Sequence, residues 1–272
     1  MSRLISRLLA RILLATRTID TAHRYFDKAW SRLVVRLASP QVLEEFNALA
    51  YESDQAYVPG AEQFRHHLFA WETATIGRLF PPPPARLLIG GAGGGREAFA
   101  LAERGYEVVA FEPAAGLANG MADLASSTRG VHAFRARYET LPLLAPARPG
   151  EAGADLRALA PFDAALMGWG SFSHLMTEDS RIQALTSLAE VVDGPILVSF
   201  LAFRTDEGPR SRGSDRSGDA FSVFIGYHHA STPAELARLA NASGLVVDHL
   251  ETDESESSWP HAILRRRADH LP

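Results

Sequence analysis

The chain has 272 residues, enough for one large domain with an extension and for a sizeable buried core. Its hydrophobic fraction of 46% and charged fraction of 22% are those of an ordinary soluble globular protein, and its net charge of −5 gives no reason to expect nucleic-acid binding. The absence of cysteine excludes disulfides and thiolate metal sites within the chain and fits a reducing compartment, so we expect a cytoplasmic protein.

The N-terminal segment differs in charge from the rest of the chain. Residues 1–38 contain eight basic and two acidic residues, a net charge of +6, which leaves −11 for the remainder. Within residues 2–14, apolar residues fill one arc of a helical wheel and arginines recur every four residues, which argues against a membrane-spanning helix and a secretory signal. We expect residues 1–38 to form a basic amphipathic helical segment. Three interpretations stay open: residues 2–14 pack on the domain or form a homodimer contact, they lie on an anionic membrane surface, or they are a mitochondrial-type presequence.

Residues 39–84 are expected to form a helical cap followed by a proline linker. Apolar residues recur at helical spacing through this segment, with a break at 51–60 that contains Tyr51 and Tyr57. The four prolines from Pro81 to Pro84 cannot continue a helix, so they form a stiff entry into the next element.

A strand–turn–helix–strand pattern covers residues 86–112. The apolar run at 87–89 predicts a buried strand, and five glycines occupy the next six positions. Residues 96–104 predict a helix, and residues 108–111 predict a second strand with Glu112 at its carboxyl end. Glycines let a ligand approach the backbone, the helix start offers N–H groups, and a carboxylate after the next strand can accept hydrogen bonds from ribose hydroxyls. The pattern therefore predicts a nucleotide-like ligand.

The glycine turn fits two cofactor classes. Read from Gly91, it matches the G-x-G-x-G of methyltransferases that use S-adenosyl-L-methionine (SAM). Read from Gly93, it matches the G-x-G-x-x-A of dinucleotide-binding domains. The turn alone does not choose between them.

Strands and helices alternate along the rest of the chain, which predicts a parallel, doubly wound sheet. We expect a loop or insertion at 145–161 and an antiparallel hairpin at the end. The expected helices are 116–126, 178–192 and one from Thr232, and the expected strands are 131–134, 162–167, 196–201, 221–225, 245–250 and 262–264.

Residues from about 86 to 266 resemble a class I SAM-dependent methyltransferase. Residues 88–97 are similar to the first motif of that family, 105–113 to its second strand with the ribose-binding acid, 162–175 to its fourth strand and following loop, and 194–197 to the entry of its fifth strand. The resemblance implies a Rossmann-like α/β domain at 85–272, with a mostly parallel sheet and a reversed C-terminal strand. Because a nicotinamide dehydrogenase does not need the closing hairpin, the order of the parts favours SAM as the cofactor.

The resemblance also implies a set of cofactor-binding residues. They are Gly91, Ala92, Gly93, Gly95, Glu112, Pro113, Tyr138, Gly168 and Trp169. Two departures from the family pattern stand out. Ile89 occupies a position where many relatives carry an acid near the methionine end of SAM, so that contact must come from elsewhere. Arg137 stands where relatives often carry an aspartate that reads adenine, so we expect Tyr138 to contact adenine by stacking.

The candidate catalytic residues are His174 and Tyr57. A general base is needed only if the acceptor must lose a proton, and His174, on the loop after the fourth strand, suits that role; the alternative is that it only fixes the loop. In this family the segment before the first strand often closes over the methyl donor, which implies such a role for Tyr51, Tyr57 and Arg65. His228 and His229 have no carboxylate at ligand spacing nearby, so no metal site is expected.

The sequence thus predicts a SAM-dependent methyltransferase that acts on a small-molecule or biosynthetic-intermediate acceptor at oxygen or nitrogen. One alternative is an NAD(P)-dependent Rossmann oxidoreductase. A second is a non-catalytic, SAM-binding partner subunit.

Overall fold

The computed structural model describes residues 22, 25–54, 57–58, 61, 67–202, 218–253 and 258–267. The predictions for residues 2–14 and for Arg65 lie outside the described residues.

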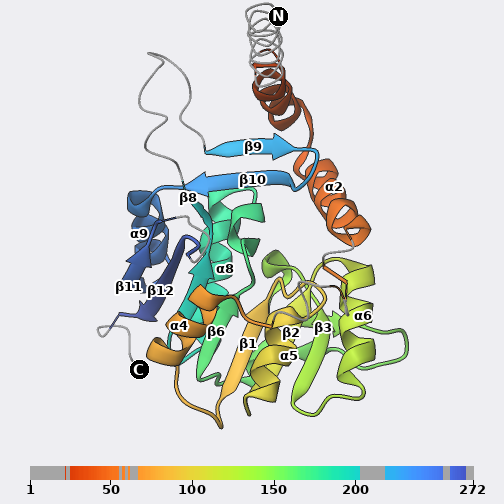
Figure 1. Cartoon of the computed structure of the whole chain (residues 1–272), viewed down its shortest axis with the longest axis vertical. Helices are drawn as coiled ribbons and strands as arrows, with labels where there is room; N and C mark the ends of the chain where they lie inside the picture. Colours follow the sequence, from red (N-terminus) through yellow and green to blue (C-terminus); the bar gives the residue numbers. More distant parts are fainter. Residues whose placement is uncertain are drawn as a thin grey trace, which may run out of the picture.

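Within the described part of the chain, the centre is a nine-stranded sheet in the order β11-β12-β7-β6-β1-β2-β3-β4-β5 (Figure 1). Parallel pairs join β1 (Arg86–Gly90) to β2 (Glu107–Glu112) and β6 (Ala164–Met167), β2 to β3 (Val131–Arg135), and β6 to β7 (Ile196–Ser199). Strand β12 (His261–Arg266) runs antiparallel to both of its neighbours, β7 and β11 (Leu245–Glu251). The predicted doubly wound sheet, its reversed strand and its closing hairpin are confirmed.

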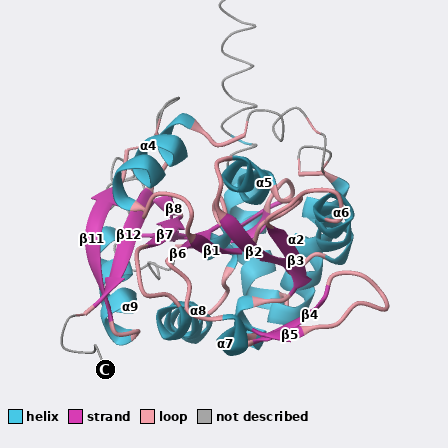
Figure 2. Cartoon of the chain, turned by 90° about the horizontal axis from the view of Figure 1, so that it is seen from below, coloured by secondary structure: helices cyan, strands magenta, loops and turns pink. Residues whose placement is uncertain are grey.

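Helices cover both faces of this sheet (Figure 2). On one face lie α4 (Ala70–Leu79), α5 (Arg96–Glu103) and α6 (Ala115–Ala125), and on the other lie α7 (Leu156–Leu159), α8 (Glu178–Val191) and α9 (Pro233–Ala242). Alternate side chains of β1 divide between two apolar clusters: Leu87 and Ile89 pack with α4 and α5, and Leu88 packs with α8 and α9. Burial on both faces explains why the central strands are continuous apolar runs in the sequence.

Two sequence predictions need correction. The segment 145–161 is not only a loop, because β4 (Leu143–Pro146) and β5 (Ala154–Asp155) extend the sheet beyond β3 and are followed by α7. Leu144 and Leu156 are buried there and give the segment its own apolar contacts. Of the strand expected at 221–225, only Phe221 and Ser222 are in a strand, β9 (Asp219–Ser222); residues 223–225 form the turn to β10 (Gly226–Ser231), which pairs antiparallel with β9.

A helical cap lies beyond one end of the large sheet. Helix α2 (Pro40–Ser53) lies there together with β9 and β10, which form a second small sheet with β8 (Leu201–Ala202) (Figure 1). Ser39 caps α2 and Pro40 begins it, which explains the start of the helix. Residues 25–37 are helical and precede this cap.

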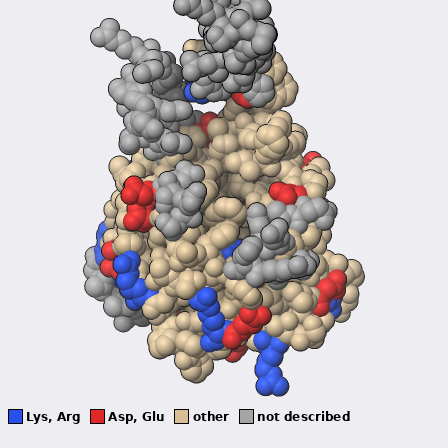
Figure 3. Space-filling view, viewed as in Figure 1, with Lys and Arg blue, Asp and Glu red and all other residues tan. Residues whose placement is uncertain are grey.

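The described surface gives two general facts. On the face drawn in Figure 3, acidic and basic side chains of the described residues are interspersed, without a large field of one sign. No helix in the described ranges combines the length and the apolar character that crossing a bilayer requires.

Candidate active site

The glycine turn between β1 and α5 takes a backbone path that favours glycine. Gly91, Gly93 and Gly95 have φ angles of +61°, +55° and +95°, in the left-handed region. The N–H of Ala92 donates to the carbonyl of Phe111 at 3.1 Å, which ties the turn to β2. A Cβ built on Gly93 would lie 4.0 Å from Cδ1 of Tyr57, so Tyr57 stands just over the open side of the turn.

Glu112 is held at the end of β2 by the backbone around it. Its Oε2 accepts the Gly93 N–H at 2.8 Å, and its Oε1 accepts the Ala114 N–H at 2.9 Å, across Pro113. Burial raises the pKa of Glu112 to about 7, although these two N–H groups act in the opposite direction. The structure thus brings Gly93, Glu112 and Pro113 together. A hydrogen-bonding acid therefore lies beside the glycine turn. With a pKa of about 7, its carboxyl gains or loses its proton near neutral pH.

A buried ion cluster lies at the start of α5. The guanidinium of Arg96 donates to both carboxylate oxygens of Glu72, at 2.7 and 2.8 Å, and to Oε1 of Glu97 at 2.7 Å. Glu72 and Glu97 are only 1% and 4% exposed. Two carboxylates face one guanidinium, and burial raises the pKa of Glu72, with a further contribution from the neighbouring Glu97. The backbone nitrogen of Trp169 lies 3.4 Å from Oε1 of Glu97, which places this acid beside the loop after β6.

The loop after β6 packs closely on the glycine turn. The Gly168 N–H donates to the carbonyl of Gly90 at 2.7 Å, and a Cβ built on Gly168 would lie 2.3 Å from the carbonyl oxygen of Gly91. The ring of Trp169 packs edge-on against Phe69 and Trp259. Close approach of two backbones, rather than ligand contact alone, therefore explains the glycine at 168.

Tyr138 lies beneath the glycine turn rather than beside it. Its ring is 5% exposed, packs edge-on against Phe111, and places its hydroxyl 3.1 Å from Oγ of Ser171. A ring buried in this way has little surface to offer adenine.

Both ring nitrogens of His174 are engaged. Nδ1 lies 2.7 Å from the carbonyl oxygen of Tyr227, which can only accept, so Nδ1 carries the proton. Nε2 lies 2.5 Å from the hydroxyl of Tyr51. Burial lowers the pKa of His174 to about 4, so the ring is neutral near pH 7 and Nε2 accepts from Tyr51. The structure thus defines the tautomer of the candidate base.

Tyr51 connects His174 with the glycine turn. Its ring packs edge-on against His174 on one side, with centroids 5.2 Å apart, and against Tyr57 on the other, at 4.8 Å. Glu112 is one of the charges that raise the pKa of Tyr51, although burial is the larger cause. The three side chains come from α2, the break after it and the loop after β6. They form a continuous row that ends over Gly93.

Asn47 positions α2 for this row. Its side-chain amide accepts the Tyr227 N–H at 2.8 Å and donates to the Tyr227 carbonyl at 3.1 Å. Glu52 accepts the N–H of Gly116 at 2.8 Å, and Glu44 pairs with Arg137. Nothing in the local sequence marks Asn47, because its partner is 180 residues away.

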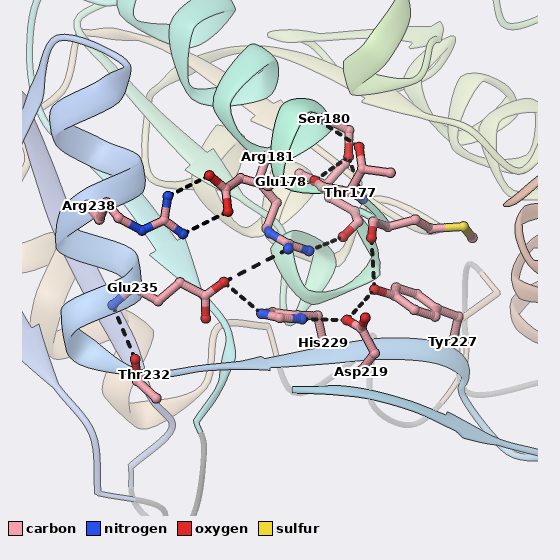
Figure 4. Close-up of polar contacts among 12 residues, drawn as sticks. Thr177, Glu178, Ser180, Arg181, Asp219, Tyr227, His229, Thr232, Glu235 and Arg238 are labelled. Atoms are coloured by element: carbon pink, nitrogen blue, oxygen red, sulfur yellow. Dashed lines mark hydrogen bonds and ion pairs between the residues drawn. The ribbon is translucent and has the colours of Figure 1, made fainter. Parts of the chain in front are cut away.

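A polar cluster holds the hydroxyl end of the Tyr227 side chain (Figure 4). The hydroxyl of Tyr227 donates toward Oδ1 of Asp219 at 2.7 Å, which also lies 2.6 Å from Nδ1 of His229. Nε2 of His229 lies 2.9 Å from Oε1 of Glu235. Each nitrogen of His229 thus faces a carboxylate oxygen. These two acids could not be paired with His229 from the sequence, because they are ten and six residues away along the chain. The cluster fixes β10, and with it the carbonyl that orients His174.

Comparisons with known proteins agree with this architecture. No protein-family profile matches the sequence, and no characterised protein matches it by sequence. Among solved structures, PH0226 protein from Pyrococcus horikoshii OT3 matches with a TM-score of 0.58 and 14% identity over 80% of this chain and 98% of its own. The CcbJ methyltransferase from Streptomyces caelestis matches with a TM-score of 0.53 and 18% identity over 72% of this chain and 88% of its own.

A third match is the 1,6-didemethyltoxoflavin-N1-methyltransferase of Burkholderia thailandensis, solved with its acceptor and S-adenosylhomocysteine. The TM-score is 0.52 and the identity 21%, over 84% of this chain and 89% of that one. The chain therefore has the Rossmann-like fold of class I SAM-dependent methyltransferases, as the sequence predicted.

Proposed function

We propose that the chain is a SAM-dependent methyltransferase that methylates a small-molecule acceptor at oxygen or nitrogen. The observation that carries the proposal is the row from Gly93 through Tyr57 and Tyr51 to His174, which begins beside a buried acid and ends at a neutral histidine with a defined tautomer.

The residues around the turn fit SAM. A Cβ on Gly93 would enter the space between the turn and Tyr57, so glycine keeps that space open for a ligand. Glu112 would hold the ribose hydroxyls, because a carboxylate at the end of the second strand suits a diol. Gly91, Ala92, Gly95, Pro113, Gly168 and Trp169 would line or support the same site.

Glu97 is the acid that would replace the one missing at Ile89. It is buried, lies beside the backbone N–H of Trp169, and belongs to a cluster in which two carboxylates share one guanidinium. Its charge contributes to the raised pKa of both Glu112 and Tyr57, so it is close to the same space. Such an acid would attract the ammonium group of the methionine moiety.

When bound, SAM supplies a methyl group on a sulfonium, so the protein aligns the acceptor, excludes water and removes any proton that the acceptor must lose. Tyr51 and Tyr57 cover the turn and would keep water out. Because the Tyr51 hydroxyl donates to Nε2 of His174, its lone pairs can accept a hydrogen bond from an O–H or N–H group of the acceptor.

His174 would therefore act through Tyr51. As the acceptor is methylated, its proton passes to the Tyr51 oxygen, and the phenolic proton passes to Nε2 of His174. The positive charge that leaves the sulfonium then resides on the imidazolium, whose Nδ1–H is already bound to the Tyr227 carbonyl. The low pKa of His174 means that it accepts a proton only once methylation has made the acceptor strongly acidic.

The test is transfer of a labelled methyl group from SAM to a panel of phenols, alcohols and amines. We expect wild-type protein to methylate at least one member, and Tyr51→Phe to lower the rate by about 10²-fold or more while SAM affinity stays unchanged. Equal rates for the two proteins would contradict the relay. Tight SAM binding without transfer to any acceptor would favour the non-catalytic partner subunit instead.

A further inference from the structure

The helix at 25–37 has one face against the cap and another that is left uncovered. The N–H of Phe221 donates to Oγ of Ser31 at 2.7 Å, and Ser31, Val34 and Val35 are half-buried. Large apolar side chains follow a different face at a spacing of four, three and four residues. They are Phe26, Trp30, Leu33 and Leu37, with exposures of 67%, 46%, 47% and 72%. We call these four side chains the apolar stripe.

Basic residues accompany the apolar stripe along the helix. Lys28, Arg32 and Arg36 recur every four residues, as do Arg3, Arg7 and Arg11 in the preceding sequence. In total, residues 1–38 carry a net charge of +6, whereas the rest of the chain carries −11. A helix with Trp, Phe and Leu on one face and Lys and Arg beside it is typical of interfacial binding to anionic lipid.

The helix also lies in a position that leaves the stripe accessible. It stands above α2 and the β9–β10 pair, on the side away from the large sheet (Figure 1). The nearby turn between β9 and β10 exposes Val223 and Phe224, at 61% and 83%. This end of the molecule therefore presents apolar side chains on two segments that are joined through Ser31 and Phe221.

From this arrangement we propose that the apolar stripe docks the protein on an anionic lipid bilayer. Packing on the protein's own domain does not account for the stripe, because the helix already uses another face for that contact. A two-fold dimer through the stripe would bring Lys28, Arg32 and Arg36 of one copy close to the same three residues of the other, since such an interface pairs the same patch with itself. An anionic bilayer instead neutralises the basic residues while it buries the aromatic ones.

The test is co-sedimentation of the full-length chain with phosphatidylcholine vesicles, with and without phosphatidylglycerol. We expect binding only to the phosphatidylglycerol vesicles, release at high salt, and at least about a tenfold loss of binding in the double variant Phe26→Ser, Trp30→Ser. Leu143→Ser is the matched control, because Leu143 is 67% exposed on β4, away from the stripe, and should bind as wild type does.

Each other outcome contradicts the proposal. Wild-type protein that does not sediment with anionic vesicles, or a double variant that binds them equally well, would overturn it. A wild-type dimer that the double variant converts to a monomer, without vesicle binding, would assign the stripe to a second copy of the chain. Circular dichroism and SAM binding of the variants report separately whether the fold and the proposed cofactor site are intact.

Discussion

The affinity for SAM should depend on pH through Glu112. Burial raises the pKa of this acid to about 7, and ribose hydroxyls bind its carboxylate form best because both of its oxygens then accept. At about pH 5.5 only about 3% of a group with that pKa is ionised, so the affinity should be roughly 30-fold lower than at about pH 8. His174, with its pKa lowered to about 4, does not titrate in this window.

Titration calorimetry with SAM at a series of pH values measures this dependence, with Glu112→Gln as the control. The variant should bind more weakly at about pH 8, by roughly tenfold or more, and should lose most of the pH dependence. A wild-type affinity that is flat across the range, or a variant that keeps the full slope, would refute the reasoning.

The same shift has a consequence for stability without cofactor. Because the pKa of Glu112 is higher in the folded protein than its usual value of 4.5, the unfolded chain releases this proton first as the pH rises. The contribution of Glu112 to the free energy of unfolding is therefore fully present below about pH 4.5 and is lost by about pH 7. Glu112→Gln removes that contribution, which urea unfolding at the two pH values would detect.

Three further predictions follow from contacts in the structure. In ¹⁵N NMR spectra, His174 should be the Nδ1–H tautomer and stay neutral down to about pH 5, because its pKa is lowered to about 4; a signal typical of Nε2–H would contradict the assignment. Arg96→Met should lower the free energy of unfolding by about 3–5 kcal/mol, measured with urea, because it leaves two buried carboxylates unpaired; a change below about 1 kcal/mol would show that they are not both charged. Gly168→Ala should lower the melting temperature, because its Cβ would meet the Gly91 carbonyl, whereas Gly77→Ala, in a helix with nothing within 4 Å, should raise it slightly; equal effects would contradict this difference.

The glycine turn and Glu112 could be predicted from the sequence because their geometry is local. The turn, α5 and β2 lie within 27 residues, and each part has its own signal in the residue pattern. The mostly parallel sheet and its reversed C-terminal strand followed from the resemblance, which also explains why the sheet was predicted better than its extra edge strands. Strands β4 and β5 have only four and two residues, so they are too short to show the alternation of apolar and polar residues that marks a strand.

Contacts between distant residues could not be predicted in the same way. His174 was a candidate from its position after the fourth strand, but its partners Tyr51 and the Tyr227 carbonyl are 123 and 53 residues away. The apolar residues at 221–225 predicted a strand, yet the strand ends at Ser222, and Val223 and Phe224 are exposed in the turn that follows. Apolar character indicates burial only where the fold supplies a covering surface.

The most direct test of the account is calorimetric titration of the wild-type chain and of Glu112→Ala with SAM, and of the wild-type chain with NAD⁺ and NADP⁺. We expect wild-type protein to bind SAM and neither nicotinamide cofactor. We expect Glu112→Ala, with its fold intact by circular dichroism, to bind SAM more weakly by roughly 1.5–3 kcal/mol, the range for a hydrogen-bonded charged group. Binding of a nicotinamide cofactor in place of SAM would contradict the proposed function, and an unchanged SAM affinity in the folded variant would remove Glu112 from the site.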